Sequence, residues 1–137
     1  MDAALRFLVT ERADNRCEYC RLPNALAPWL AFHVEHVVPR QHGGTDDASN
    51  LGFACSRCNL HKGTNLSGID PLTRKVVLLF NPRRQRWLRN FEWQGIRIAG
   101  KTPVGRATIA VLGMNHLDRV GIRESLRKQG LFPFAEP

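Results

Sequence analysis

The sequence predicts an α+β domain in which two cysteine pairs hold the ends of a strand–loop–strand–helix unit. Three observations support this fold class. Cys17 and Cys20 form one Cys-x-x-Cys pair, and Cys55 and Cys58 form a second. Between the pairs, two short apolar runs flank a polar loop that contains glycine and aspartate, as expected for two strands and their connection. One helical pattern precedes the first pair, and another starts at the second.

The composition indicates a folded protein with an anionic partner. A chain of 137 residues with 43% hydrophobic residues can bury a real core, so we expect one compact domain, or a small core with an extension. The formal charge of +8 favours a polyanion. Nucleic acid is the first candidate and an anionic membrane surface the second, while a basic surface that only keeps the protein soluble is the alternative.

The four cysteines predict a structural zinc site. No apolar run approaches the roughly 20 residues of a membrane span, and the first residues lack the basic start of a signal peptide. We therefore expect a cytoplasmic protein that has no membrane segment and keeps its thiols reduced. Four thiolates complete the tetrahedral coordination of Zn²⁺ and leave no position for a substrate. Buried free cysteines or a redox pair are the alternatives, but a redox pair needs a βαβ context, which the pattern lacks.

The first half of the chain gives the elements in order. Residues 3–13 have helical spacing of apolar residues, and residues 30–38 read as a strand. Alternation along that strand places Phe32 and Val34 in the core, with His33 and Glu35 on the opposite face. A polar loop, a second strand at residues 51–54 and a helix that runs to Gly63, with Ser56 as its N-cap, complete the unit.

The second half predicts an extension of turns, a hairpin and helices. Residues 76–80 suggest a strand, and Gln94-Gly95 between two apolar runs suggests a β-hairpin. Thr102-Pro103 predicts the start of a helix, and a last helix ends near Gly130. We expect residues 1–65 to form the core with the N-terminal helix and zinc knuckles. Residues 66–137 should pack on it as an extension that is not an independent domain.

The loop enclosed by the cysteines carries residues suited to phosphodiester hydrolysis. This reaction needs a base for water, a cation for the phosphate charge and a group that orients the base. His36 can act as the base, and the adjacent Glu35 can bind a hard cation through oxygen. Asn50 could bond the imidazole through its side chain or backbone, and Asn59 could supply a second oxygen ligand. Each of these residues alone could be an ordinary solvated or turn residue. The presence of all four at these spacings argues against that explanation.

At these positions the chain resembles the HNH endonuclease family. The resemblance rests on Glu35-His36, Val37-Val38-Pro39-Arg40, Gly43-Gly44, Asn50-Leu51, Cys55-x-x-Cys58-Asn59 and Lys62-Gly63. It covers residues 17–63 and implies a ββα-metal (His-Me finger) core flanked by the four-cysteine zinc site. It also implies His36 as general base, Asn50 as the residue that orients it, and Glu35 and Asn59 as ligands of one Mg²⁺ or Mn²⁺. Two departures are Glu35, where the family has Asp, and Asn59, where other members have His.

Several further residues could contact phosphate. His33 could line the site as a phosphate contact or support a metal ligand, or it could be merely exposed. His61 lies about 200° around the helix from Asn59, so we expect a solvent or phosphate contact there before a metal ligand. Lys62 could contact phosphate or support a ligand. With these, a basic surface could form from Arg40, Arg57, Arg83, Arg84, Arg86 and Arg89. Its alternative is a solvated helix face, with Trp87 packed in the core.

The resulting hypothesis is a metal-dependent endonuclease that hydrolyses DNA. The alternative is a catalytically inactive zinc module that only binds nucleic acid, and a protein–protein interaction module is a third, less favoured reading. The second half of the chain could extend the nuclease sheet, form a DNA-binding lobe or mediate a homodimer. The sequence gives neither the cleavage sequence nor a choice between DNA and RNA.

Overall fold

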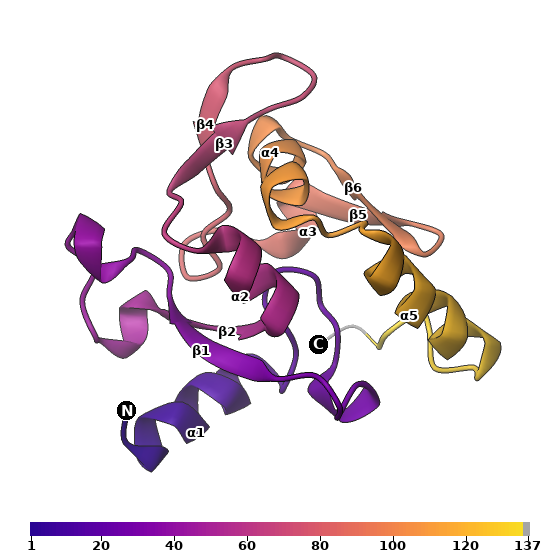
Figure 1. The fold of residues 1–137 in the computed structure, drawn as a ribbon, viewed down its shortest axis with the longest axis horizontal. Coiled ribbons are helices and arrows are strands. Elements are labelled where there is room, and N and C mark those ends of the chain that lie inside the picture. Colours follow the sequence, from indigo (N-terminus) through magenta and orange to yellow (C-terminus); the bar gives the residue numbers. More distant parts are fainter. Residues whose placement is uncertain (136–137) are drawn as a thin grey trace.

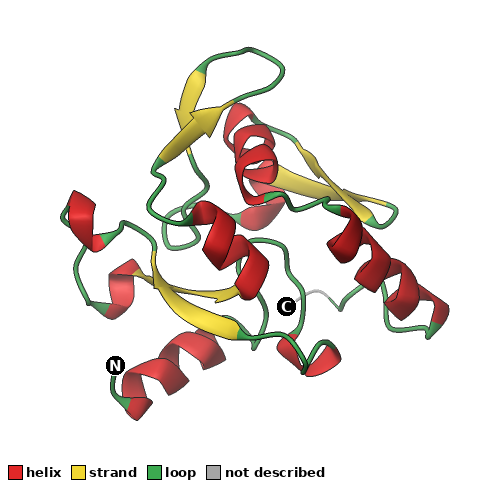
Figure 2. Ribbon diagram, viewed as in Figure 1, coloured by secondary structure: helices red, strands yellow, loops and turns green. Residues whose placement is uncertain are grey.

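The computed structural model describes residues 1–135, which combine helices with short antiparallel strands (Figures 1 and 2). The longer elements are α1 (Ala3–Arg12), β1 (Phe32–His36), β2 (Leu51–Cys55), α2 (Ser56–Lys62), β3 (Ser67–Ile69), β4 (Val76–Leu78), α3 (Trp87–Asn90), β5 (Phe91–Gln94), β6 (Arg97–Gly100), α4 (Pro103–Leu112) and α5 (Leu117–Lys128). Short 3₁₀ turns lie at Asn24–Leu26, Arg40–His42 and Ala48–Asn50. The mixed α/β composition is the one that the sequence predicts.

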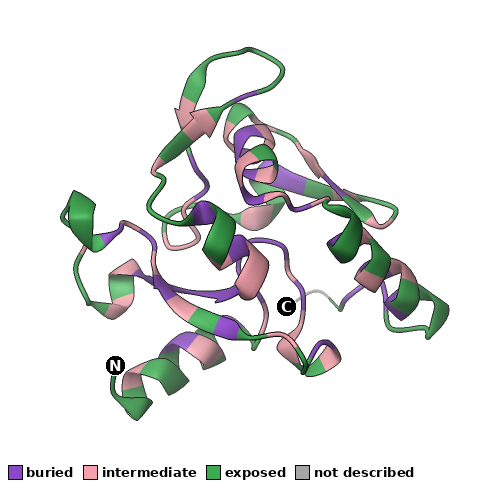
Figure 3. Cartoon of the chain, in the orientation of Figure 1, coloured by how far each residue is buried: buried purple, intermediate pink, exposed green. Residues whose placement is uncertain are grey.

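The first half of the chain is a two-stranded sheet between two helices. β1 and β2 pair antiparallel, with Phe32 opposite Cys55 and His36 opposite Leu51. Figure 1 shows α1 against one side of this pair and α2 against the other. All five residues of β2 are buried, which is expected of a strand covered on both faces (Figure 3). The order strand, loop, strand, helix agrees with the sequence prediction.

The burial along β1 differs from that of a strand with one face open to solvent. Phe32 is buried and His33 exposed, as expected, but Val34 is only half-buried and Glu35 is 7% exposed. Because α1 and α2 cover opposite faces of the sheet, both faces of the strand contain protected positions, including the face that carries Glu35. Glu35 is therefore an interior carboxylate, with consequences for the site described below.

The start of α2 also differs from the expectation. The predicted N-cap, Ser56, is the first helical residue, and the cap is Cys55, whose Sγ accepts from the backbone N–H of Cys58 at 3.5 Å. A sulfur thus takes the place of the usual cap oxygen. Cys55 therefore has two roles: it caps α2, and it is one of the four cysteines of the expected zinc site.

The second half packs around α4. Thr102 caps this helix as predicted, accepting from Gly105 N at 3.0 Å, and Gly113 ends it in the left-handed conformation. The helix lies against β6, the β3–β4 pair and α2. Gly105 permits its close approach to α3, because an added Cβ there would lie 2.0 Å from the Asn90 carbonyl oxygen. The predicted hairpin is β5–β6, whereas β3 lies in a stretch that the sequence suggests to be turn-rich.

The hydrophobic core is continuous between the two halves. Phe80 contacts both Tyr19 and Phe91, with ring centroids 6.3 Å and 5.2 Å apart. From Phe91 the aromatic series continues through Trp87 and Trp93 to Phe132 and Phe134. Within residues 1–135, no helix is long and apolar enough to cross a membrane.

A buried ion pair fixes the β3–β4 connection to α4. Arg106 Nε and Nη2 donate to Asp70 Oδ1 and Oδ2, both at 2.9 Å, while Leu72 N and Thr73 Oγ1 donate to the same carboxylate. The hydrogen bond from Arg106 is the largest cause that lowers the pKa of Asp70 below its ordinary value. The connection therefore depends on Asp70 remaining ionised.

We expect Asp70→Asn to lower the melting temperature by several degrees at pH 7, because the ion pair is lost. Since the folded-state pKa lies below the unfolded one, the wild-type contribution is complete above about pH 4 and declines as the pH falls through the folded value. The melting-temperature difference between wild type and variant should therefore shrink at pH 3. Calorimetry at both pH values tests this, with the exposed Asp47→Asn as control; an equal difference at both would contradict it.

Candidate functional site

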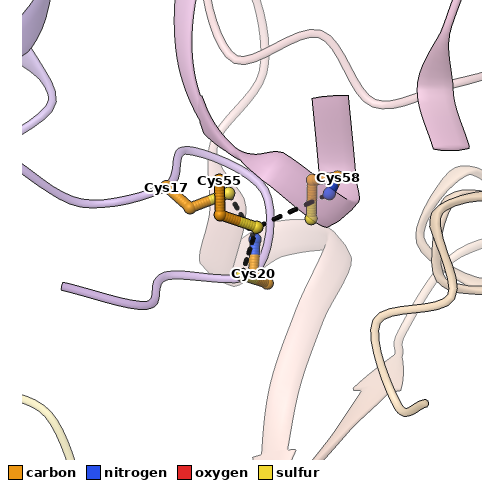
Figure 4. A group of neighbouring side chains, drawn as sticks. All are labelled: Cys17, Cys20, Cys55 and Cys58. Atoms are coloured by element: carbon orange, nitrogen blue, oxygen red, sulfur yellow. Dashed lines mark hydrogen bonds between the residues drawn. The ribbon is translucent and has the colours of Figure 1, made fainter. Parts of the chain in front are cut away.

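The four cysteines form one buried cluster. Cys17 and Cys20 come from the turn after α1, and Cys55 and Cys58 from the junction of β2 and α2 (Figure 4). Their sulfur atoms all lie within 4.8 Å of one another, and all four are free thiols. A tetrahedral Zn²⁺ with Zn–S bonds of about 2.3 Å requires S···S separations of about 3.8 Å. Cys20 Sγ and Cys55 Sγ are 3.7 Å apart, so the cluster could hold zinc.

Backbone and side-chain donors surround the sulfur atoms. Cys20 N donates to Cys17 Sγ at 3.4 Å, which repeats the contact made at Cys55. Arg119 of α5, 4% exposed, donates from Nη2 to Cys55 Sγ at 3.7 Å. Burial lowers the pKa of Arg119, but the charge and hydrogen bond of Cys55 outweigh it and raise the pKa overall. A positive charge therefore lies beside the sulfurs, where four thiolates and one Zn²⁺ would leave a net negative charge.

The thiols themselves have opposed pKa shifts. Hydrogen bonds from Cys17, Cys20 and Cys58 lower the pKa of Cys55, whereas burial raises that of Cys17. Neighbouring thiols in such a cluster can share the charge of one thiolate. Four thiolates together require a cation among them, which is the chemistry expected of a zinc site.

Zinc content should separate this cluster from the rest of the site. We expect the purified protein to contain one equivalent of zinc, and Cys58→Ser to lose it together with much of its folded stability, because metal binding contributes to folding. The His36→Ala variant should keep its zinc, since His36 is not one of the four cysteine ligands. Elemental analysis and circular dichroism of the three proteins test this; zinc loss in both variants would contradict two separate sites.

His36 lies at the end of β1 and faces the following loop. Its Nε2 lies 2.7 Å from Asp46 Oδ1, and Arg40 Nη2 lies 2.9 Å from the same oxygen. The hydrogen bond to His36, followed by that from Arg40, holds the pKa of Asp46 below its ordinary value. Asp46 is thus an anion at neutral pH that fixes the orientation of the imidazole.

Glu35 is held by two buried partners. The hydroxyl of Tyr19 donates to Oε1, and Lys62 Nζ lies 2.9 Å from Oε2. Tyr19 is fully buried, and burial raises its pKa well above the ordinary value, with Glu35 adding to the rise. The phenol therefore stays protonated and remains a donor. These partners fix the carboxylate in one position, from which it also reaches a wall of the pocket described below.

Lys62 supports the strand instead of contacting solvent. It is 2% exposed, and besides Glu35 its ammonium donates to the carbonyl oxygens of His36 and Val37 at 3.1 Å and 2.9 Å. All three donors are thereby used. The prediction of a surface phosphate contact at Lys62 is wrong, and the alternative of support for Glu35 agrees with this geometry.

Asn50 does not bond the imidazole. Its Oδ1 accepts from Val38 N at 2.9 Å, and its Nδ2 donates to Val38 O at 3.0 Å and to Thr45 O at 2.8 Å. The predicted direct contact with His36 is therefore wrong for the side chain. Instead, Asn50 ties Val38, two residues beyond β1, to Thr45 in the loop that carries Asp46, so it can position His36 only through the backbone.

One open pocket brings most of the predicted residues together. Its volume is about 440 Å³, and its lining residues are Val34, Glu35, His36, Pro39, Arg40, Gln41, Asn59, Gly63 and Thr64. Glu35, His36 and Asn59 therefore share one cavity. Asn50 lines a different pocket, and His33 and His61 are exposed side chains outside this lining.

The predicted basic surface is divided among different environments. Arg83 is an interior partner of Glu18, and Arg57 donates to Gly113 O and pairs with Asp118. Arg86 and Arg89 line a separate pocket with Trp87. These arginines therefore do not form one continuous track for phosphate.

Sequence reasoning missed three parts of this site. Asp46 is one of two adjacent aspartates in a polar loop, and nothing in the local pattern shows which one reaches His36. Tyr19 lies between two cysteines and reads as a knuckle residue. Arg119 is more than 60 residues beyond Cys55. All three depend on tertiary contacts, which spacing along the chain does not encode.

Comparison with known proteins shows what this segment of the chain is similar to. Residues 17–65, just over a third of the chain, match the family model described as "HNH endonuclease". The matched segment contains the zinc-type cluster, β1, β2 and α2.

A curated relative is similar over most of the chain. This relative is the Septu protein PtuB of Bacillus thuringiensis, which is 30% identical over 120 residues, or 85% of this chain. The aligned part spans 43% of the length of that protein. No solved structure matches the chain significantly.

Proposed function

We propose that the protein is a metal-dependent HNH endonuclease that hydrolyses DNA, with His36 as the general base. The observation that carries this proposal is the pocket in which His36, held by Asp46, lies with Glu35 and Asn59. The family of residues 17–65 supports a nuclease reaction. The order β1, β2, α2 supports the ββα-metal architecture that this family implies.

The contact with Asp46 suggests how the base works. When Nε2 carries the ring proton and donates it to Asp46, the lone pair on Nδ1 is free to accept a proton from water. The carboxylate then stabilises the imidazolium that forms. Asp46 and Asn50 act as positioning residues in this scheme, one through the ring and the other through the loop.

The pocket offers the oxygen ligands that a hard cation requires. Glu35 and Asn59 would hold one Mg²⁺ or Mn²⁺, because carboxylate and amide oxygens suit these ions. Each carboxylate oxygen has two lone pairs, so the bonds from Tyr19 and Lys62 do not exhaust those of Glu35. When bound, the ion neutralises charge that develops on the phosphate and its leaving oxygen. Tyr19 and Lys62 would keep the carboxylate oriented.

We expect His36→Ala to slow plasmid cleavage by about 100-fold or more, because the general base is removed. Wild-type protein should nick or linearise plasmid in Mg²⁺ or Mn²⁺ and leave it intact without added divalent ions. Agarose gels over a time course provide the measurement. Wild-type protein that shifts plasmid on a gel but never cleaves it, in either ion, would instead favour the inactive nucleic-acid-binding module.

Asp46 and Asp47 provide a matched pair for the positioning role. Asp46→Ala should reduce the cleavage rate by about 10- to 100-fold, the usual cost of removing a group that orients a catalytic imidazole. Asp47→Ala removes an exposed neighbouring carboxylate that makes no contact with His36, so its rate should stay close to wild type. Initial rates on the same plasmid compare them, and equal rates for both variants would rule out this role.

A further inference from the structure

A second pocket lies away from His36 and combines arginines with tryptophans. Its volume is about 420 Å³, within the range of small-molecule sites. The lining residues are Arg16, Arg21, Arg86, Trp87, Leu88, Arg89, Trp93, Phe134 and Ala135. None of them lines the pocket that contains His36. We propose that this pocket binds a nucleotide, with the base against the tryptophan rings and the phosphate against the arginines.

The aromatic part of the pocket is fixed in place. Trp87 donates from Nε1 to Tyr19 O at 2.7 Å, and its ring packs 5.1 Å from that of Phe91. Trp93 packs edge-on against Phe132 and Phe134, at 5.1 Å and 5.9 Å. Both tryptophans line the pocket and remain partly exposed, so these contacts fix the rings while part of their surface stays accessible. Rigid aromatic surfaces of this kind stack nucleobases without regard to sequence.

The charged part is wholly cationic. Four of the nine lining residues are arginines, and none is acidic. Arg86 and Arg89 are exposed, and no carboxylate in residues 1–135 lies within ion-pair distance of either. Arg16 has Asp14 as a partner, and the Arg21 guanidinium lies 5.8 Å from the centre of the Trp87 ring. Arg86 and Arg89 are therefore the best placed to bind phosphate.

A nucleotide matches both parts at once. An apolar ligand would offer no anion to Arg86 and Arg89, and inorganic phosphate would leave the tryptophans unused. The ligand could be a free mononucleotide or one nucleotide of a strand. This binding goes beyond the proposed cleavage reaction, because it requires neither His36 nor a divalent ion.

Tryptophan fluorescence can test this directly. Trp29 is 67% exposed and lies outside the pocket, so Trp29→Phe leaves Trp87 and Trp93 as the only tryptophans. His36→Ala in the same protein prevents cleavage during the titration. AMP, a short oligothymidylate and inorganic phosphate are added separately, without divalent ions. We expect saturable quenching by AMP, by the oligonucleotide or by both, and much weaker binding of phosphate.

Charge variants test the arginines. Arg86→Glu with Arg89→Glu should weaken binding about tenfold or more, because both charge-assisted contacts become repulsive. Arg74→Glu with Lys75→Glu, in the exposed β3–β4 turn, changes the net charge equally and should alter the affinity by no more than about twofold, since screening limits distant charges. Unchanged circular dichroism and zinc content would show that both proteins are folded.

The outcomes distinguish a free nucleotide from a strand as the ligand, and they distinguish failure of this inference from failure of the nuclease proposal. Stronger binding of AMP identifies a free nucleotide, and stronger binding of the oligonucleotide identifies a strand; both support the pocket. No quenching, phosphate binding as tight as AMP binding, or equal effects of the two charge variants would overturn it. Quenching by a protein whose wild-type form cleaves no DNA would leave this inference standing while the nuclease proposal fails.

Discussion

The four buried thiols are the constraint on which the site depends. They join the turn after α1 to the junction of β2 and α2, and so close a loop of more than 30 residues that contains β1 and the polar connection after it. A Zn²⁺ ion bound by the four cysteines would offset the entropy cost of closing such a loop. The sulfurs lie at one end of the β1–β2 pair and His36 at the other. The metal-type cluster can therefore hold the frame rigid without taking part in the chemistry.

Inside that frame, polar contacts replace the hydrophobic packing that a small loop lacks. Lys62 ties the end of β1 to α2 through two carbonyl oxygens and Glu35. The side chain of Asn50 holds the loop through three hydrogen bonds, and Asp46 of this loop bonds the His36 ring. Each step fixes the position of the next group. The orientation of the imidazole thus rests on a series of hydrogen bonds, and none of the contacts found within residues 1–135 involves its Nδ1.

The sequence predicts this arrangement where its signals are local. Cysteine spacing, the Thr102 cap and the Gln94-Gly95 turn each act within a few residues, and the corresponding elements are present. Predictions fail where the environment is set by distant residues. Alternation does not reveal that Glu35 is buried, because its burial depends on the helices that cover both faces of the sheet. Asn50 bonds the backbone because the loop brings Val38 and Thr45 to it. The shared pocket of Glu35, His36 and Asn59 is consistent with the family pattern, while Asp46 follows from the fold alone.

The contact between Arg119 and Cys55 shows that the segment that matches the family does not contain every residue that surrounds its sulfur atoms. The segment that matches the family ends at residue 65, yet the cation beside its sulfurs belongs to α5. A fragment cut at that boundary would keep every thiol and lose the charge that offsets them. Transplanting the matched segment into another protein would meet the same difficulty. The segment that matches the family is therefore shorter than the part of the chain that surrounds the sulfur atoms.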